Sequence, residues 1–406
     1  MIYLDPARRD YLIPFNVLST GQPPYATAMN VIEALRRTWP ESLREAPRFT
    51  NLMLAALLVL IANQLTLVEL PRLLTDQPFR ETLLDRADDP ELTSVFHERL
   101  DKWGRERALI LESILNKVSA FALNPSLRLM LGQRENRLDF RRMMDEGQVL
   151  IVNLGHCDGE TRRLLGSLIT TLVEQATLAR ASLPAQTRRP FYFYLDEFQD
   201  FCANASSTTT LAQVLSESRK FGLHLTLAHQ TLGQLLGERL RAALGNIGTK
   251  VVFQVDRVDA EMLAPKLFVA GGEQVKHEVE DEAHQPRSHP IYYALTEEWE
   301  QAIRALQHLP PRTCWVKRPG RGVVKLHTIT MLQARQSGDA LEQLVRGLAR
   351  QSGEACEVLE RTLDQRWAAP TSEPTTYYEP IPPPVVSPTI KRLTITTASL
   401  EEMRRR

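Results

Sequence analysis

The stretch FYFYLDEFQDF, residues 191–201, decides the fold of this 406-residue chain. Five apolar residues end abruptly at Asp196 and Glu197, which predicts a buried strand with two carboxylates at its carboxyl end, where parallel sheets bind ligands. The pattern is typical of a Walker B segment. Asp196 is expected to hold the Mg²⁺ of a bound nucleotide, and Glu197 to act as the base toward an attacking water. In the alternative interpretation, the two acids only end the strand and cap the next segment.

Other apolar runs of strand length surround this segment and alternate with helical patterns. The runs cover residues 149–154, 223–228 and 250–255, and helical patterns cover residues 160–181, 211–221, 232–244 and 259–268. Strands that are apolar throughout, alternating with helices, indicate a mainly parallel sheet covered by helices on both faces. The predicted fold class is therefore α/β.

Polar residues at the end of the run 223–228 extend the candidate site. Gln230 lies where RecA-like motors place a residue that contacts the γ-phosphate, although it is also consistent with a polar strand end without function. His229 is expected to pack rather than act as a base. Arg219 and Lys220 end the preceding helix, where cations are favoured by the helix dipole. The alternative for Arg219 is an arginine finger that reaches a nucleotide held by a neighbouring subunit.

The chain lacks a phosphate-binding loop of the form G-x-x-x-x-G-K-[ST]. The segment GNIGTK, residues 245–250, has the wrong order and spacing. The sequence therefore carries half of a nucleotide site. His277, His284 and His289 lie in the charged segment 273–290, which we expect to be an irregular loop without a metal site because the spacing fits neither a helix nor a hairpin.

The flanking segments predict the domain organisation. Residues 1–20 supply a strand of the core, residues 21–147 an inserted all-α domain, residues 148–335 the core itself, and residues 336–368 a C-terminal helical segment. Helix starts are marked at Thr66 to Glu69, at Asp89-Pro90 and at Asn124-Pro125, and Gly147 is placed to end the last helix of the block. Residues 314–330 are expected to form a hairpin, and residues 341–348 an amphipathic helix. The proline-rich residues 369–406 are predicted to be disordered.

Composition limits the broad class of the protein. Lys plus Arg and Asp plus Glu each total 49, which argues against a strongly basic nucleic-acid binder. The four cysteines (Cys157, Cys202, Cys314 and Cys356) form no C-x-x-C pair and indicate a reducing compartment. The longest apolar run, residues 52–62, is shorter than the roughly 20 residues of a membrane span and is expected to be a core helix. No signal peptide is recognisable, so a cytoplasmic location is expected.

Five segments in one order resemble the TraG/TraD-type coupling proteins of conjugation and type IV secretion, which are RecA-like ATPases related to the HerA/FtsK translocases. They are LDPARRDYLIPFNVL (4–18), LDFRRMMDEGQVLIVNL (138–154), RPFYFYLDEFQDF (189–201), SESRKFGLHLTLAHQTLGQL (216–235) and GNIGTKVVFQVDRVDAEMLAP (245–265). The resemblance implies ATP and Mg²⁺ as cofactors, a homo-hexameric motor, and DNA, a relaxase and type IV secretion components as partners. It makes Asp196 and Glu197 the Walker B pair, Gln230 the sensor and Arg219 the candidate finger.

The chain departs from the family pattern because the membrane helices and the P-loop strand are missing before Met1. It is therefore expected to be the C-terminal part of a coupling protein that cannot hydrolyse ATP alone, and the complete protein is expected at the cytoplasmic face of the inner membrane. One alternative is a non-hydrolysing module that binds DNA or relaxase on a degenerate core. Another is a metal-dependent nuclease using Asp196, Glu197 and Asp200, which is disfavoured because no further acidic or histidine motif is evident.

Overall fold

The computed structural model describes residues 1–43, 47–202, 218–234, 242, 244–245, 247–272, 274–280, 288–332, 335 and 337–368. Most residues of the two helices expected at 211–221 and 232–244 lie outside the described residues, and so do all of residues 369–406. Within residues 1–369 the chain forms one compact unit.

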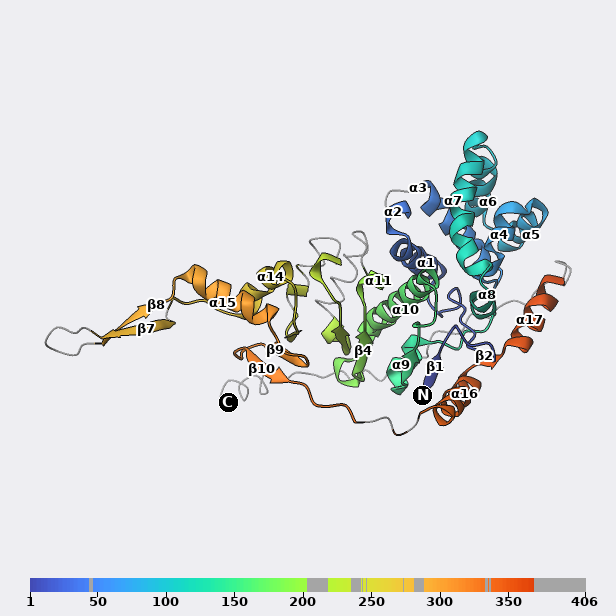
Figure 1. Ribbon diagram of the computed structural model, residues 1–406. Helices are drawn as coiled ribbons and strands as arrows, with labels where there is room; N and C mark the ends of the chain where they lie inside the picture. The colour runs from blue at the N-terminus through green and yellow to red at the C-terminus, as the bar shows by residue number, and fades with distance from the viewer. Residues whose placement is uncertain are drawn as a thin grey trace, which may run out of the picture. The chain divides into compact units, whose positions relative to one another are not determined.

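Parallel strand pairs form the centre of the fold (Figure 1). Strand β1 (Ile2–Leu4) pairs with β3 (Leu150–Val152), so the N-terminal strand predicted at residues 2–4 is confirmed. Strand β4 (Phe191–Leu195) pairs with β5 (Leu223–Leu227) in the register Phe191 to Leu223. The long helix α10 (Gly159–Ala179) follows β3 and begins at Asp158, whose carboxylate accepts hydrogen bonds from the backbone N–H groups of Glu160 and Thr161. The α/β fold class is confirmed.

Antiparallel strands extend the fold beyond the parallel pairs. Strand β9 (Thr313–Lys317) pairs with both β6 (Lys250–Val252) and β10 (Val324–His327), which confirms the hairpin predicted at residues 314–330. Helices α14 (Arg257–Leu267) and α15 (Leu295–Gln307) pack beside them. Gly320, in the hairpin turn, has a φ of +67°, a conformation that glycine adopts without a steric penalty.

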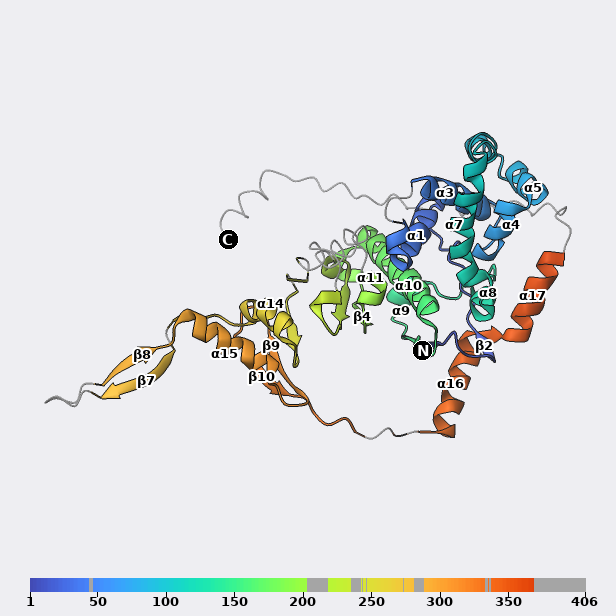
Figure 2. The same cartoon turned by 45° about the horizontal axis from the view of Figure 1, so that its top comes forward.

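The expectation of an irregular loop at residues 273–290 is wrong. Strands β7 (Val275–Glu280) and β8 (Ser288–Tyr292) form an antiparallel hairpin (Figure 2). Val275, Ile291 and Tyr292 are exposed although they are apolar. The side chains described in this hairpin form no buried face that would select an alternating pattern, which explains why period-2 hydrophobicity did not reveal it.

Nine α-helices precede β3 in the described part of the block between residues 21 and 147. They are α1 (Pro24–Thr38), α2 (Pro40–Leu43), α3 (Pro47–Ala62), α4 (Leu70–Thr75), α5 (Gln77–Ala87), α6 (Pro90–Ser94), α7 (Arg105–Ala122), α8 (Pro125–Leu131) and α9 (Phe140–Glu146). The three predicted helix starts are confirmed: the Glu69 carboxylate accepts from the Thr66 N–H at 2.9 Å, and Asp89 and Asn124 cap α6 and α8. Gly147 ends α9 with a φ of +69°.

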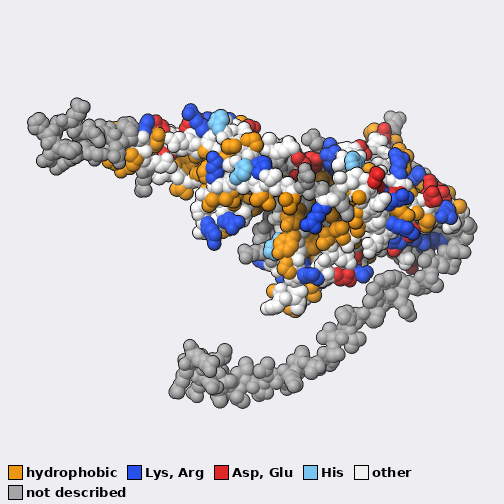
Figure 3. Space-filling model, turned by 60° about the horizontal axis from the view of Figure 1, so that its bottom comes forward, with side chains coloured by type: hydrophobic (Ala, Val, Ile, Leu, Met, Phe, Trp, Pro, Cys, Tyr) orange, Lys and Arg blue, Asp and Glu red, His pale blue; other side chains and the backbone are white. Residues whose placement is uncertain are grey.

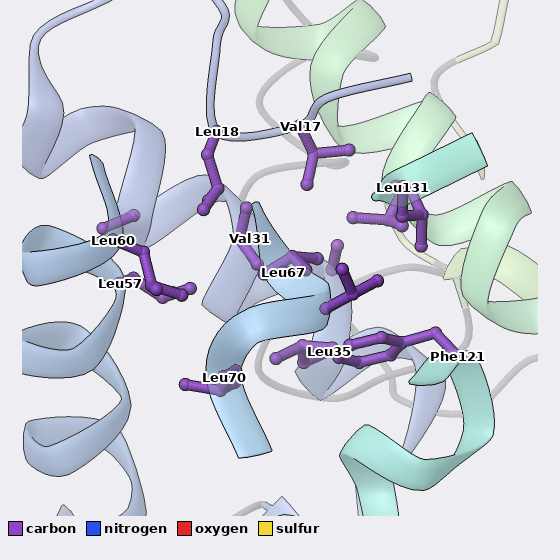
Figure 4. Close-up of a cluster of buried hydrophobic side chains, with 14 of the residues drawn as sticks. Val17, Leu18, Val31, Leu35, Leu57, Leu60, Leu67, Leu70, Phe121 and Leu131 are labelled. Atoms are coloured by element: carbon purple, nitrogen blue, oxygen red, sulfur yellow. The ribbon is translucent and has the colours of Figure 1, made fainter. Parts of the chain in front are cut away.

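A continuous hydrophobic core joins this helical block to the strands and to α10. In Figure 4, leucines of α3 meet side chains of α1 and α7, with Leu35 lying against Phe121. The apolar run 52–62 lies in α3, and Leu57 and Leu60 are fully buried, so the predicted core helix is confirmed. No helix among the described residues is both long enough and apolar enough to cross a membrane.

The C-terminal part of the described chain returns to the N-terminal part. Helix α16 (Asp339–Ser352) contains the predicted amphipathic stripe, although Leu341 and Leu344 are exposed. Strand β11 (Glu354–Ala355) pairs with β2 (Tyr11–Leu12), and α17 (Cys356–Ala368) reaches α8. The buried Glu69 accepts hydrogen bonds from Arg366 and, at 3.2 Å, from Trp367.

The expectation that helices cover the sheet on both faces is wrong for the described residues. Phe191 and Phe193 pack on the core, whereas Tyr192 and Tyr194, which alternate with them along β4, are exposed. Strand β3 shows the same alternation, with Ile151 exposed. The strands are apolar on both faces, as in a fully buried sheet, but the helices among the described residues cover only one of them.

A buried ion pair links the helical block to the core. The guanidinium of Arg37 on α1 donates to both carboxylate oxygens of Glu174 on α10, at 3.1 and 2.7 Å, and both side chains are almost completely buried. Figure 2 shows the two helices lying together. Burial raises the pKa of the Glu174 carboxyl, and the charge and hydrogen bonds of Arg37 oppose that rise. Removal of either partner would therefore leave the other as a buried charge without its counter-ion.

Removing one partner of this pair should strongly destabilise the protein. We expect Glu174→Ala to lower the free energy of unfolding by about 3–5 kcal/mol, because it leaves the Arg37 guanidinium buried without its main partner. The double variant Arg37→Met/Glu174→Leu should recover most of that loss, since the replaced volume becomes apolar. Urea unfolding followed by circular dichroism measures both effects. Arg142→Ala, which breaks an exposed pair with Glu146, is the control. Equal midpoints for Glu174→Ala and Arg142→Ala would contradict the prediction.

Candidate functional site

The carboxyl ends of β4 and β5 meet at one edge of the sheet. Beyond the last paired residues, the backbone N–H of Ala228 donates to the Leu195 carbonyl at 2.9 Å, and the N–H of Phe198 donates to the Ala228 carbonyl at 3.1 Å. These two bonds continue the strand register into the adjoining loops. They place Asp196 and Glu197 beside His229 and Gln230, so three of the four predicted site residues lie at one edge.

Glu197 occupies a strained backbone conformation at this edge. Its φ is +50°, in the left-handed region, which costs a residue other than glycine about 1–3 kcal/mol. The Gln230 side-chain N–H donates to Glu197 Oε1 at 2.6 Å, and the Gln199 side-chain N–H donates to Oε2. Both carboxylate oxygens are therefore held by amides from opposite sides. Strain of this kind gathers at functional sites, where surrounding contacts maintain it.

Asp196 presents a carboxylate that suits a hard cation. The side chain is exposed, and its Oδ1 accepts the Glu197 backbone N–H at 3.1 Å. Oδ2 has no hydrogen-bond partner among the described residues. Mg²⁺ is commonly held by one or two carboxylates together with water and substrate phosphates. The environment of Asp196 fits that role.

The residue after Glu197 and the residue before Gln230 pack against each other through their aromatic rings. Phe198 is completely buried, and His229 packs against it edge-to-face, with ring centroids 5.5 Å apart and planes at 82°. This is the packing role expected for His229. The His229 Nδ1 is buried and has no hydrogen-bond partner among the described residues. Leu154, Leu195 and Leu227, from the ends of the neighbouring strands, complete the apolar support.

Two further candidate residues are Arg219 and Asp200. Arg219 belongs to the short 3-10 helix Ser218–Phe221 just before β5, and its side chain lies outside the described residues. Asp200, on α11 (Gln199–Cys202), lies 4.0 Å from Arg162. Among the described residues there is no group of three His, Cys, Asp or Glu side chains that could hold a metal ion. The side chains of His277, His284 and His289 are not described.

The segment 245–250 holds its lysine in a structural role. Lys250 Nζ donates to the carbonyls of Gly245 at 2.9 Å and Ile247 at 2.7 Å, so its ammonium group closes the turn before β6. Burial lowers the pKa of Lys250, and the nearby Lys317 and Lys266 lower it further. A phosphate-binding lysine instead needs a free ammonium group above a ring of backbone N–H groups. These contacts agree with the interpretation from the sequence that residues 245–250 do not form a P-loop.

A second polar cluster at the carboxyl ends of β1 and β3 was not recognised in the sequence. The Asn153 side-chain N–H donates to Tyr3 at 3.0 Å and to Asp5 Oδ2 at 3.1 Å, and the Tyr3 hydroxyl lies 3.3 Å from the same carboxylate oxygen. Burial is the main cause that raises the pKa of Tyr3, so the hydroxyl stays protonated and donates to Asp5. Asp5 and Asn153 each follow an apolar run, which is the signal that could have identified them.

The candidate site lies within a segment that matches a known protein family. Residues 127–321 match the family described as the type IV secretion-system coupling protein DNA-binding domain. No curated protein matches the chain. The matched segment contains β3, α10, β4 and β5, and therefore Asp196, Glu197 and Gln230.

Solved structures of one coupling protein share the fold. The chain is similar to the bacterial conjugative coupling protein TrwBdeltaN70 in its unbound form, with a TM-score of 0.56, 20% identity, and coverage of 83% of this chain and 75% of that chain. It is also similar to TrwB in complex with the non-hydrolysable GTP analogue GDPNP, with a TM-score of 0.58, 20% identity, and coverage of 83% and 76%. A third match is TrwB in complex with ADP and Mg²⁺, with a TM-score of 0.55, 20% identity, and coverage of 82% and 75%.

The family match and these shared folds agree with the resemblance carried by the five sequence segments. Residues 127–321 of the chain thus belong to the family of type IV secretion-system coupling protein DNA-binding domains, and the chain shares the fold of a coupling protein of that kind.

Proposed function

We propose that this chain is a subunit of an ATP-dependent DNA translocase that serves a conjugative or type IV secretion apparatus. The observation that carries the proposal is the 2.6 Å hydrogen bond from Gln230 to Glu197, which joins the end of β5 to the carboxylate after β4. It supports a site in which a sensor and a base are coupled. The family description, a DNA-binding domain, supports DNA as the substrate. The solved TrwB complexes with nucleotides and Mg²⁺ support ATP and Mg²⁺ as cofactors.

Each residue of the site has one role in this proposal. Asp196 holds Mg²⁺, which neutralises phosphate charge when it is bound. Glu197 accepts a proton from the attacking water through a carboxylate oxygen. Gln230 holds Glu197 in the described arrangement, and its amide can turn to a γ-phosphate oxygen instead. That exchange would free Glu197 Oε1 for water only when a triphosphate is bound, and so would limit hydrolysis to the loaded site.

The remaining half of the site lies outside residues 1–406. A P-loop supplies backbone N–H groups and a lysine to the β- and γ-phosphates, and this sequence has no such motif. We propose that a polypeptide segment beyond these residues supplies it. We also propose a homo-hexamer in which Arg219 acts on a neighbour's nucleotide, an all-α domain within residues 21–147, contacts with single-stranded DNA and relaxase, and membrane attachment outside this sequence.

The alternative function is a recognition module that binds DNA or relaxase without hydrolysis. One observation favours it: both oxygens of Glu197 already accept a hydrogen bond from a glutamine amide, which lowers the basicity of the carboxylate toward a water. Nucleotide turnover by the completed site separates the two functions.

Substitution of Glu197 tests the proposed function directly. We expect residues 1–406 alone to hydrolyse ATP negligibly. Fused behind a strand–G-x-x-x-x-G-K-T–helix unit through a flexible linker, the chain should show DNA-stimulated turnover. Glu197→Gln should lower that rate by about 10²–10⁴-fold, the range for loss of a general base, while nucleotide binding is retained. Glu112→Gln, on the exposed surface of α7, should leave the rate unchanged. Equal rates for Glu197→Gln and Glu112→Gln would refute the assignment.

Subunit mixing tests the role of Arg219. In the fused protein, Arg219→Ala should slow hydrolysis by about 10³–10⁵-fold, the range for arginine fingers, while folding and ATP binding are preserved. Lys220→Ala, on the same short helix, should have little effect. Arg219→Ala and Glu197→Gln subunits should each be inactive alone and regain turnover when mixed, because a mixed ring can pair an intact site with an intact neighbouring arginine. Near-normal turnover by Arg219→Ala alone would show that the arginine only complements its own helix end.

A further inference from the structure

A cavity of about 590 Å³ lies beside β9, between α15 and the segment that follows α14. Ala302 and Ala305, three residues apart on one face of α15, leave space where larger side chains would fill the gap. The rings of Phe268, Trp299 and Trp315 line the same space. Its volume lies within the usual range of ligand sites, about 300–1,000 Å³. None of the lining residues belongs to the candidate nucleotide site.

The lining of this cavity is held in place by contacts within the chain. The Trp315 Nε1–H donates to the carbonyl of Ala305 at 3.3 Å, and a neighbouring phenylalanine ring packs edge-to-face on Trp315, with centroids 5.1 Å apart and planes at 84°. Glu298, which is buried, accepts the backbone N–H groups of Gly272 at 3.1 Å and Gln274 at 3.2 Å. Both oxygens of this carboxylate are therefore engaged, and the chain after α14 is tied to α15. The cavity is formed before any ligand arrives.

One side of the cavity carries positive charge that no carboxylate balances. Lys317 and Arg321 line it, and Arg318 and Lys325 lie on the same hairpin. Lys317 Nζ donates to a backbone carbonyl at 2.6 Å, and the Lys325 ammonium lies 5.8 Å from the centroid of the Trp315 ring, so both contact neutral groups. In the part of the chain that the structure describes, none of these four cations forms an ion pair.

The sequence around the cavity contains no acidic residue over a long stretch. Residues 301–338 include seven Lys and Arg and no Asp or Glu, whereas charges of the two signs are equal in number, 49 each, over the whole chain. Figure 3 shows Lys and Arg side chains beside hydrophobic ones in the part of the molecule that contains β9 and β10, left of the centre of the view. The local balance of charge therefore favours an anionic ligand.

The shape of the cavity favours a peptide over a nucleic acid. Proteins that bind single-stranded nucleic acid place successive aromatic rings along a groove whose cations follow the phosphate backbone. Here the aromatic rings surround a single cavity, closed on one side by the alanines of α15. The side-chain amides of Gln274 and Gln301 also line it, and an amide can both donate to and accept from a peptide bond. A peptide with one large apolar side chain beside carboxylates would fill the apolar part and pair with the cations.

We propose that this cavity is a docking site for an acidic segment of a partner protein. One aromatic or large aliphatic side chain of that segment inserts between Trp299 and Trp315, and its neighbouring carboxylates pair with Lys317 and Arg321. Charge complementarity and a preformed apolar cavity carry the proposal together, because the side chains that dominate protein interfaces are anchors in well-packed, desolvated pockets. The site adds a partner contact to the proposed function and does not depend on nucleotide hydrolysis.

Binding of peptide pools tests the site. The probes are three fluorescein-labelled pools of equal peptide length, measured with the full chain by fluorescence polarisation. The first pool carries one Phe, Trp or Leu among Asp and Glu residues, the second carries Ser in place of the apolar residue, and the third carries Lys in place of the acids. We expect the first pool to bind about tenfold more tightly than either other pool, because it alone matches both the apolar cavity and the cations. Equal binding of the first two pools, or no binding of any pool, would overturn the proposal.

Two variants with matched controls supply the second readout. Arg321→Glu reverses a charge at the cavity, and Arg335→Glu makes the same change on an exposed cation of the same acid-free stretch that does not line it. Ala302→Leu fills the cavity, and Ala340→Leu adds the same side chain at an exposed position of α16. Arg321→Glu and Ala302→Leu should each weaken binding of the first pool by about tenfold, and both controls should bind as the wild type does. Circular dichroism checks that all four variants fold. Equal binding within either matched pair would contradict the assignment.

Three other results would assign the cavity to a different occupant and so overturn the proposal. Oligothymidylate that binds more tightly than the first pool, and loses that binding in Arg321→Glu, would identify a nucleic-acid site. The same pattern with vesicles of anionic phospholipid would identify a lipid site. A dimer of the chain that excludes the peptides and is split by Ala302→Leu would identify a second copy.

Discussion

The parallel pairing of β4 with β5 is the constraint on which the site depends. Its register, Phe191 to Leu223 through Leu195 to Leu227, sets which residues leave the sheet side by side. A slip of one residue would turn every side chain of a strand to the opposite face and move Gln230 away from Glu197. The buried Phe198 and the two backbone bonds at Ala228 fix that register at the carboxyl end. The left-handed conformation of Glu197 is maintained at the same point by hydrogen bonds from both sides.

The helical block is joined to this sheet through its own core rather than through a surface contact. Helix α1 packs along α10, and the bidentate Arg37–Glu174 pair is buried between them. Both side chains are too deeply buried for water to take the place of a missing partner. The ion pair therefore favours one relative position of α1 and α10. The C-terminal helix α17 adds a second link, because Gln133, next to α8, donates to the Leu359 carbonyl at 3.1 Å.

The edge that holds the candidate site belongs to strands with one uncovered face. Glu197 and Gln230 are joined at the carboxyl edge by a 2.6 Å hydrogen bond. The strands are apolar on both faces, and among the described residues helices cover one of them. Tyr192 and Tyr194 are suited to the exposed face of an unpartnered chain and to an interface, because their rings are amphipathic.

The sequence by itself determined the fold class, the strands of the parallel pairs and several helix ends, because these depend on local patterns. The apolar run ending at Asp196-Glu197, the caps at Asp89 and Asn124, and Gly147 each act within a few residues, and the structure agrees with all of them. Only the tertiary structure decided which of these residues meet. The hydrogen bond between Glu197 and Gln230 spans 33 positions, and the cluster of Tyr3, Asp5 and Asn153 spans about 150. Burial was also decided there: the residues of β4 are apolar on both faces, and the packing of Phe191 and Phe193 on the main core leaves Tyr192 and Tyr194 in solvent.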